Sequence, residues 1–473
     1  MNASTFYSSL ISKFPHTPTL KQEQALQYLS QFVFADDQDQ LFLLKGFAGT
    51  GKTTLISSLV NMLNQTNKKF VLLAPTGRAA KVIGNYSCYP AHTIHKHIYY
   101  PKKKGGGVSF TLAPNKYRNT IFIVDEASMV PDVISDSKLF ENGSLLDDLI
   151  EYVYTGHYCK LVLMGDTAQL PPVNLDVSPA LNENTLRVNY GRNVSCIELD
   201  EVVRQQQDSG ILENATLLRE QLAESFFGNI KFKLKGFNDV IRLIDGYEIQ
   251  DAITDAYSLH GKEETTIIVR SNKRANQYNQ QIRGRILFLE NELAVGDYLM
   301  VVKNNYFWVK ASSEAGFIAN GDIIEVLAIY AFKELYGFRF AEVKVKMVDY
   351  PNMQPFETVL LLDALGAESP ALSYDDANKL YEEVLKDYAS ETSKYKKFLK
   401  VKSNPFFNAL QVKFSYAVTC HKSQGGQWHT VFVEQPYMPN GIDREYVRWL
   451  YTAVTRAREK LFLIGFKDDF FEN

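Results

Sequence analysis

The residues with the clearest chemical potential lie in a stretch at 46–54, Gly-Phe-Ala-Gly-Thr-Gly-Lys-Thr-Thr, which fits the phosphate-binding pattern G-x-x-x-x-G-K-[ST]. In such a loop, backbone N–H groups and the N-terminus of the next helix converge on an anion. Lys52 would reach the outer phosphates, and the Thr53 hydroxyl would ligate Mg²⁺. The spacing predicts an ATP and Mg²⁺ site formed by Gly46, Ala48, Gly49, Thr50, Gly51, Lys52, Thr53 and Thr54.

The elements on either side of this stretch are those that position such a loop. Residues 41–44 are apolar and predict a buried strand, while residues 54–63 have the apolar spacing of a helix. A chance match to the pattern is the alternative. The strand and helix in the correct order argue against it.

Polar side chains follow two further apolar strands. Residues 120–124 run into Asp125 and Glu126, and residues 161–164 run into a segment that contains Gln169. Ligands of open α/β sheets bind at the carboxyl ends of strands. Asp125 would hold Mg²⁺ through water, Glu126 would polarise the attacking water, and Gln169 could bridge that water to the γ-phosphate. A helix N-cap is the alternative for the acidic pair alone.

Composition limits the class of protein. With 473 residues, of which 45% are hydrophobic, the chain can bury two or three cores. No signal peptide and no apolar run of roughly 18 residues is evident, so we expect a cytoplasmic protein without a membrane partner. The net charge of −3 means that a nucleic acid would need a local groove. Four scattered cysteines argue against a disulfide framework, an iron–sulfur cluster or a zinc ribbon.

Five motifs in one order resemble those of superfamily 1 helicases, and the RecD-like and phage Dda-like group most closely. They are the phosphate loop and residues 125–128, 165–172, 419–425 and 451–458. The resemblance covers roughly residues 17–465, nearly the whole chain. It implies two RecA-like domains with ATP between them, moving 5′ to 3′ on single-stranded DNA toward duplex junctions. A monomer suffices for that mechanism, and no room is left for a nuclease or primase module.

The resemblance also assigns roles outside the phosphate loop. Gln24, in Leu-Lys-Gln-Glu-Gln, would hydrogen-bond the adenine edge, although a solvated glutamine is the alternative. Arg204 and Arg456 would both reach the γ-phosphate from the second core domain. Two such arginines would bond the transferring phosphoryl group only when the cleft is shut. The alternative for either one is a surface ion pair.

Nucleic-acid contacts are expected on the other rim of the same sheets. The strand at 71–74 leads into a turn and a helix whose N–H groups could take a phosphate. In the first core domain the candidates are Pro75, Thr76, Thr93 and His95, and in the second they are Thr419, His421 and Lys422. A zinc site is the rival interpretation of Cys88, His92, His95 and His97, but its spacing fits no standard finger.

A short insertion at 97–118 reads as a hairpin around a basic, glycine-rich turn. We hypothesise that it is a strand-separating pin, with Tyr99, Tyr100 or Phe110 stacking on the last base pair. The alternative is a solvated loop. Unwinding that survives alanine substitution of these rings would exclude the pin.

A second insertion, 291–404, predicts a small β-barrel followed by helices. Asn320-Gly321 lies between apolar runs and signals a hairpin. Ser373 begins a capping-box pattern before an amphipathic helix. Lysines and aromatic residues then interleave over 394–402, which makes Lys396 and Lys397 candidate nucleic-acid contacts, with a solvated helical face as the alternative.

The predicted fold class is α/β, with two RecA-like parallel-sheet domains and two insertions. The first core domain would comprise 1–96 and 119–198, and the second 199–290 and 405–473. The sequence predicts an ATP-dependent DNA helicase. An RNA-directed helicase of the same superfamily is one alternative, since backbone contacts do not inspect the 2′-hydroxyl. An ATP-gated nucleic-acid clamp or remodeller without strand separation is the other.

Overall fold

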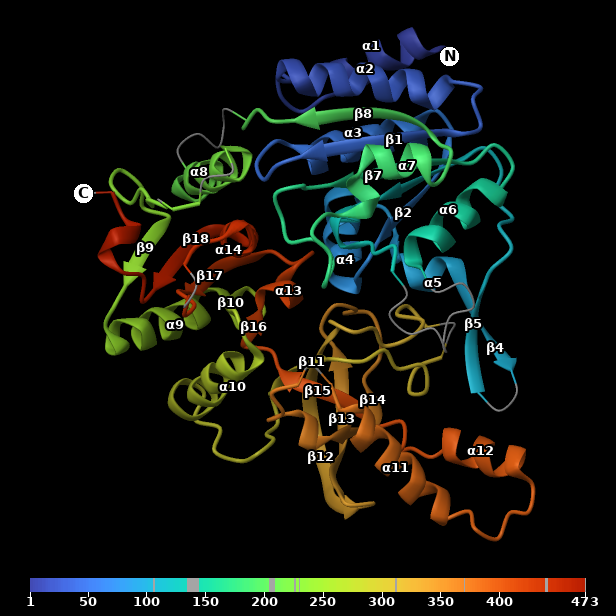
Figure 1. Ribbon diagram of the computed structural model, residues 1–473, viewed down its shortest axis with the longest axis vertical. Coiled ribbons are helices and arrows are strands. Elements are labelled where there is room, and N and C mark those ends of the chain that lie inside the picture. Colours follow the sequence, from blue (N-terminus) through green and yellow to red (C-terminus); the bar gives the residue numbers. More distant parts are fainter. Residues whose placement is uncertain are drawn as a thin grey trace.

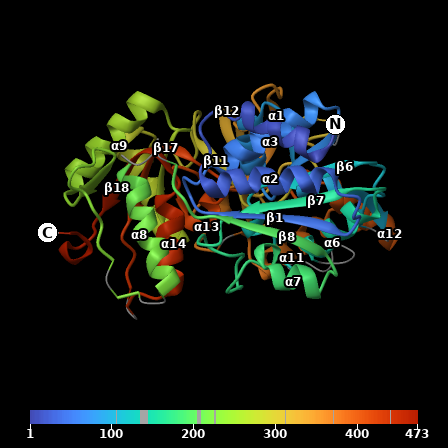
Figure 2. The ribbon, with the colours of Figure 1, turned by 90° about the horizontal axis from the view of Figure 1, so that it is seen from above.

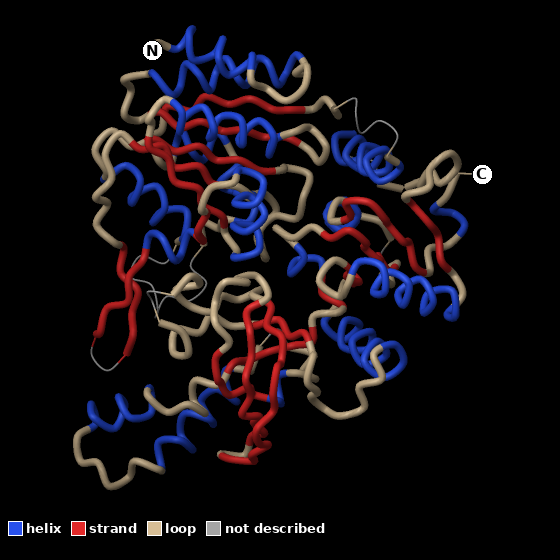
Figure 3. Tube along the Cα trace, turned by 180° about the vertical axis from the view of Figure 1, so that it is seen from behind, coloured by secondary structure: helices blue, strands red, loops and turns tan. Residues whose placement is uncertain are grey.

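Two α/β lobes lie side by side, and a β-barrel with a helical extension lies beneath them (Figure 1). This computed structural model describes residues 1–104, 107–133, 144–203, 209–224, 227–228, 230–310, 313–369, 371–438 and 441–472. Seen from above, the lobe that holds the N-terminus and the lobe that holds the C-terminus form the two ends of the molecule (Figure 2). Seen from behind, the strands separate into two sheets, a barrel and a projecting hairpin (Figure 3).

The first lobe is built on a six-stranded sheet in which every neighbouring pair is parallel. Its central strands are apolar throughout because helices cover both faces of a parallel sheet. In spatial order the strands are β3 (Ala91–Thr93), β2 (Lys69–Ala74), β6 (Thr120–Val124), β7 (Lys160–Gly165), β1 (Gln40–Gly46) and β8 (Asn193–Leu199).

Helices bury an apolar stripe against each face of this sheet, which gives the lobe two cores. One core is formed with α1 (Ala3–Ser12), α2 (Leu20–Phe34), α3 (Lys52–Gln65) and α4 (Gly77–Ser87). The other is formed with α5 (Ile94–Ile98), η1 (Ala127–Met129), α6 (Leu145–Thr155), η2 (Pro179–Leu181) and α7 (Glu183–Val188).

The second lobe repeats the plan with a five-stranded parallel sheet. Its spatial order is β16 (Ala417–Thr419), β10 (Thr265–Val269), β17 (Trp428–Glu434), β18 (Ala457–Ile464) and β9 (Val240–Leu243). One face packs against α8 (Gly210–Glu224), α14 (Arg444–Val454) and η6 (Asp468–Phe470). The other packs against α9 (Gly246–His260), α10 (Asn272–Gln281) and the π-helical turn η4 (Ile282–Ile286), while α13 (Cys420–Ser423) follows β16.

The insertion in the second lobe contains a closed five-stranded barrel that shares its apolar core with one face of the second sheet. Its strands are β11 (Tyr298–Val301), β12 (Ile323–Leu335), β13 (Phe338–Met347), β14 (Phe356–Leu361) and β15 (Leu410–Phe414), with η5 (Leu362–Ala364) after β14. The boundary predicted at 404 therefore falls before a barrel strand. Barrel closure requires β15 to pair with both β11 and β14.

The hairpin predicted at Asn320-Gly321 is wrong. Residues 320–322 form a turn that leads into β12, and β12 pairs with β11 and β13 instead. The tight hairpin turn is at Tyr336-Gly337, where both residues have positive φ, 59° and 73°. Such turns match the twist of the flanking strands, and they accept few residue types besides glycine and asparagine at both positions, so Tyr336 gave no turn signal.

Two peripheral elements complete the fold. The N-cap half of the predicted capping box is confirmed, because the Ser373 side chain accepts a hydrogen bond from Asp376 N–H at the start of α11 (Tyr374–Lys386). The Asp376 carboxylate accepts from the Ser373 hydroxyl and not from its backbone N–H. Helix α12 (Lys394–Lys402) follows. The hairpin of β4 (Tyr99–Lys104) and β5 (Gly107–Leu112) projects from the first lobe, and α12 lies close to β5 (Figure 1).

The predicted α/β class with two parallel sheets and a barrel is confirmed. Among the described residues, no helix is long and apolar enough to cross a bilayer.

Candidate active site and nucleic-acid interface

The phosphate loop connects the end of β1 to the start of α3. Gly51 has φ +80°, and a Cβ there would stand 2.5 Å from Nε2 of Gln22, so this position requires glycine. Lys52 Nζ donates to the carbonyl oxygens of Gly46 and Phe47, at 2.6 and 2.8 Å. Thr50 is fully buried, and its hydroxyl donates to Phe47 O at 2.8 Å. The loop residues that line the cleft between the lobes are Phe47, Ala48, Gly49, Gly51, Lys52, Thr53 and Thr54.

The acidic pair follows β6 as predicted. Glu126 adopts a left-handed backbone conformation with φ +52°, and its N–H donates to Oδ1 of Asp125 at 2.8 Å. This turn directs two carboxylates to the cleft instead of starting a long helix. Burial, together with the neighbouring Glu126 carboxylate, raises the pKa of Asp125 to about 7. The Asp125 carboxylate is an oxygen donor of the kind that a divalent cation prefers, and the Glu126 carboxylate lies next to it.

A cleft of 1130 Å³ opens between the two lobes and is lined from both sides. The first lobe contributes Lys52, Asp125, Glu126 and Gln169, and the second contributes Arg456. The Oε1 atom of Gln169 is buried and has no hydrogen-bond partner among the described residues. An unpaired buried amide oxygen is costly, which suits a group that receives a water or a ligand.

Arg456 enters the cleft from the end of α14 and is 3% exposed. Its Nε and Nη1 donate to the carbonyl oxygens of Thr452 and Gly426, at 3.0 and 3.2 Å, and its guanidinium lies 3.9 Å from Glu126 Oε1. The prediction that Lys52 and Arg456 share one cleft is therefore met by the geometry. The other predicted arginine, Arg204, lies outside the described residues.

The structure corrects the position of the predicted glutamine. Gln24 is exposed and does not line the cleft, whereas Gln22 is 3% exposed and lines it. Residues two apart in a helix point to nearly opposite sides, so only one of them can face the loop. Gln22 completes a capping box with Thr19, and its Nε2 donates to Thr50 O at 2.9 Å. The capping pattern of Thr19 followed by Gln22 could have identified it.

Three further residues, which lie in the motifs at 419–425 and 451–458 but were given no role of their own, bind the lobes to each other. The Tyr451 hydroxyl contacts both the phosphate loop and Asp166, and Thr452 Oγ1 accepts a hydrogen bond from Leu170 N–H at 2.9 Å. Gln424 Nε2 donates to Leu170 O at 2.7 Å. The loop that carries Gln169 is thus held from the opposite lobe.

In the first lobe, the predicted nucleic-acid contacts lie at the carboxyl ends of β3, an edge strand, and of its neighbour β2. Pro75 and Thr76 follow β2, where the Thr76 hydroxyl caps α4 by accepting from Ala79 N–H at 3.2 Å. Thr93 ends β3 and caps α5 by accepting from Lys96 N–H at 3.2 Å. Burial lowers the pKa of His95, in α5, to about 4, so this imidazole is neutral at pH 7.

In the second lobe, Thr419 ends β16, the edge strand of the sheet, and His421 and Lys422 follow it in α13. Thr419 is half-buried, and His421 is exposed. The Lys422 ammonium is buried with no hydrogen-bond partner among the described residues, and burial followed by repulsion from Lys413 lowers its pKa to about 8. Among the described residues, no hydrogen-bond acceptor therefore compensates the charge of the Lys422 ammonium.

The hairpin rings are not equivalent. Tyr99 donates to Asp148 Oδ2 at 2.5 Å, and Phe110 is 6% exposed with its ring centroid 4.3 Å from that of Tyr306. Neither ring is therefore open to a base in this conformation. Tyr100 is 41% exposed.

On α12, Lys396 is exposed and Lys397 is half-buried.

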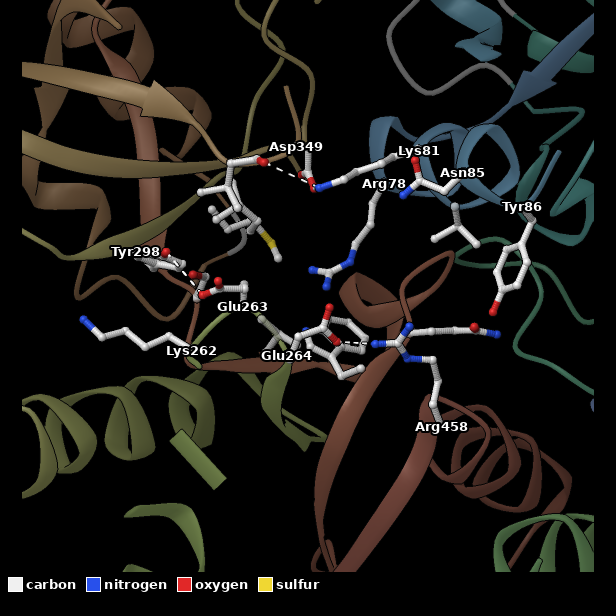
Figure 4. A pocket seen from close by; sticks show the side chains of 18 residues that line it. Arg78, Lys81, Asn85, Tyr86, Lys262, Glu263, Glu264, Tyr298, Asp349 and Arg458 are labelled. Carbon is white, nitrogen blue, oxygen red and sulfur yellow. Dashed lines mark hydrogen bonds and ion pairs between the residues drawn. The ribbon is translucent and has the colours of Figure 1, made fainter. Parts of the chain in front are cut away.

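A second cavity, of 520 Å³, lies where α4 meets the barrel and the second sheet (Figure 4). Arg78 points into it, with its guanidinium stacked 3.9 Å from the ring centroid of Trp428. Lys81 pairs with Asp349 of the insertion at 3.5 Å, and Arg458 pairs with Glu264. The Arg78–Trp428 and Lys81–Asp349 contacts brace the first lobe against the second lobe and the insertion, whereas Arg458–Glu264 lies within the second lobe.

The rival zinc interpretation gains no support from the geometry. Cys88, His92, His95 and His97 are all described, and the described residues contain no group of three or more His, Cys, Asp or Glu side chains that could hold a metal. His97 packs instead among the rings of His92, Tyr117, Phe122 and Tyr152.

Two family models match this chain, an AAA domain over residues 19–231 and a UvrD-like helicase C-terminal domain over residues 414–464. The ATP-dependent RecD2 DNA helicase of Deinococcus radiodurans is 25% identical over 90% of this chain and 47% of its own length. The ATP-dependent DNA helicase dda of Enterobacteria phage T4 is 25% identical over 89% of this chain and 93% of its own.

Among solved structures, a Pif1 helicase from Bacteroides in complex with ADP-AlF3 and ssDNA aligns over 96% of this chain and 94% of its own, with 14% identity and a TM-score of 0.47. The phosphate loop, the acidic pair, Gln169 and Arg456 meet on one cleft in the order of the family motifs. By its two family-model matches and these two relatives, the chain is similar to ATP-dependent DNA helicases of the RecD2 and Dda kind.

Proposed function

We propose that this protein is an ATP- and Mg²⁺-dependent helicase that translocates 5′ to 3′ on single-stranded DNA and separates the duplex ahead of it. One observation carries the proposal: Lys52, Glu126 and Gln169 of the first lobe face Arg456 of the second across a single cleft. A nucleotide bound there touches both lobes. Binding and hydrolysis can therefore change how the lobes sit.

The residues fit Mg²⁺ and ATP. Thr53 and Asp125 would hold the metal, because a hydroxyl and a carboxylate are the oxygen donors that it prefers, and the unpaired Gln169 oxygen can receive the attacking water. Bound Mg²⁺ neutralises charge on the phosphates. Glu126 takes the proton of the water, while Lys52 and Arg456 stabilise the transferring phosphoryl group. Release of the γ-phosphate would remove the anion that Arg456 binds across the cleft between the lobes.

The rate of ATP hydrolysis should depend on pH through protonation of Asp125. Its pKa is raised to about 7, so the carboxyl gains a proton as the pH falls through that value and then cannot ligate Mg²⁺. We expect kcat/KM for ATP to drop about tenfold per pH unit below about pH 7, because this ratio reports ionisations of the free enzyme. Higher Mg²⁺ should move the drop to lower pH by competing with the proton. A profile that stays flat down to about pH 5.5 would contradict the assignment.

We assign recognition of the adenine base to Gln22. Its amide lies beside the phosphate loop, and its capping box fixes it there. We expect Gln22→Ala to raise KM for ATP about tenfold, with kcat changing less, because the lost bonds act on the ground state as much as on the transition state. Gln24→Ala, in the same helix and exposed, is the matched control. Equal KM values for the two variants would refute the assignment.

The track for single-stranded DNA is proposed along β2, β3 and β16, the strand ends that carry Thr76, Thr93 and Lys422. Backbone N–H groups at the start of α4 and the two threonines suit phosphate oxygens. The buried Lys422 ammonium, which has no partner among the described residues, suits a phosphate as its counterion. On the hairpin, Tyr100 is the exposed ring suited to stack on the duplex end.

Helix α12 is proposed to hold nucleic acid beside the hairpin. We expect the double variant Lys396→Ala/Lys397→Ala to flatten the slope of log K against log salt by about 1.4 for a single strand, since each phosphate contact contributes about 0.7. The matched control is Lys333→Ala/Lys346→Ala, because these barrel lysines pair with Glu342 and Glu325 at 2.6 and 2.7 Å. An unchanged slope in the first variant would show that α12 touches no phosphates.

The whole proposal is tested by unwinding of duplexes with a 5′ or a 3′ single-stranded overhang. We expect ATP-dependent strand separation on the 5′ overhang alone. ATPase stimulation by DNA and RNA strands of equal sequence distinguishes the RNA-directed alternative. Strong stimulation by DNA without separation of either substrate would favour a clamp or remodeller.

A further inference from the structure

The hydroxyl of Tyr451 bridges the seam between the lobes. Tyr451 lies on α14 of the second lobe and is 1% exposed. Its oxygen accepts a hydrogen bond from Ala48 N–H in the phosphate loop at 2.9 Å and donates to Asp166 Oδ2 at 2.7 Å. Burial raises the pKa of Tyr451 well above its ordinary value, so the proton needed for the second bond is retained.

The second acceptor connects this hydroxyl to the loop that carries Gln169. Asp166 is itself 1% exposed, and its Oδ1 accepts from Ala168 N–H at 2.9 Å, which fixes the turn of that loop. One phenolic oxygen of the second lobe thus contacts two catalytic loops of the first. A single displacement of α14 would free both loops together.

The same two loops pack into the core of the second lobe. Ala168 and Leu170 belong to the apolar cluster formed by α8, α14 and the second sheet, and Phe47 and Ala48 pack against it. Ring packing therefore holds the loops near α14 whether or not the hydroxyl is present. The hydroxyl additionally fixes the orientation of the two loops, because it donates one hydrogen bond and accepts another.

We propose that Tyr451 is a positioning residue that makes the alignment of the phosphate loop and of Gln169 depend on closure of the seam. The inference rests on the proposed ATPase, and it names the contact through which the second lobe acts besides Arg456. When the lobes part, Ala48 N–H and the Asp166 carboxylate lose their partner at the same time. Both loops then relax, which prevents hydrolysis in the open state.

The test compares full-length Tyr451→Phe with Tyr446→Phe. Both tyrosines lie on α14 and are buried, at 1% and 0% exposure, but the Tyr446 hydroxyl has no hydrogen-bond partner among the described residues. Each variant keeps its ring and loses one oxygen. Thermal unfolding of both variants first establishes that they fold. Two readouts follow: amide hydrogen exchange without nucleotide, and DNA-stimulated ATPase.

We expect Tyr451→Phe to speed exchange in peptides covering 46–51 and 166–170 by about tenfold, and to lower kcat by about tenfold with KM for ATP nearly unchanged. Tyr446→Phe should match the wild type in both. Normal exchange and kcat in Tyr451→Phe would overturn the proposal. So would an equal loss in Tyr446→Phe, or a raised KM with kcat intact. A wild-type protein without DNA-stimulated ATPase would instead refute the proposed function, and exchange alone would then decide whether Tyr451 holds the two loops.

Discussion

Arg456→Lys is expected to lower kcat of the DNA-stimulated ATPase about a thousandfold, in the range found for arginines that bind a transferring phosphoryl group. Lysine keeps the charge but lacks the planar fork. In this cleft the fork is held by the carbonyl oxygens of Thr452 and Gly426 while it faces Glu126. Steady-state phosphate release measures the effect, and binding of a fluorescent ATP analogue should change only a few-fold.

The control for this variant is Arg242→Lys. Arg242 lies in the same lobe, on β9, and pairs with Asp468 at 2.7 Å, away from the cleft. Its kcat should equal that of the wild type. If Arg456→Lys retained more than about a tenth of the wild-type kcat, Arg456 would have no special role in stabilising the transferring group.

Glu126→Gln should abolish turnover while leaving nucleotide bound. Glutamine has the same shape but cannot take a proton from water, so kcat should fall roughly a thousandfold, within the range for loss of a general base. The left-handed backbone at this position is unaffected, because the two side chains share the same Cβ and Cγ. Phosphate release and nucleotide affinity, measured on one sample, separate the two effects.

A neutral residue at 126 also removes the charge that helps to raise the pKa of Asp125. We therefore expect nucleotide affinity in the presence of Mg²⁺ to hold or improve in Glu126→Gln. The control is Glu198→Gln, an exposed residue on β8 that does not line the cleft. Weak nucleotide binding in Glu126→Gln would show that Glu126 serves the metal instead of the water.

The parts of the site that the sequence predicted are those in which residue type and backbone shape coincide. Gly51 must be glycine because of its positive φ and the nearby Gln22 amide, and Lys52 follows directly on the helix. The acidic pair and Gln169 follow buried strands, so the sheet alone brings them to the cleft. Local patterns of this kind can be recognised in the amino-acid sequence alone.

The parts that were missed depend on contacts between segments far apart in the chain. Gln22 and Gln24 differ only in which side of α2 faces the phosphate loop, and a polar helix start does not reveal that side. Tyr451 reaches Ala48 from about four hundred residues away. Barrel closure recruited β15 from beyond the expected insertion for the same reason, since strand pairing is decided by the partner strands.

The contact between Phe110 and Tyr306 has a mechanical consequence. Tyr306 also contacts the Phe317 ring in a tilted arrangement, with ring centroids 4.8 Å apart. Through Phe110, the β4–β5 hairpin therefore contacts the insertion of the second lobe as well as its own lobe. A wedge anchored at one end bends under load, whereas one clamped at two points stays stiff. If the hairpin separates strands as proposed, force from a resisting duplex would pass through this aromatic contact into the insertion of the second lobe instead of bending the hairpin.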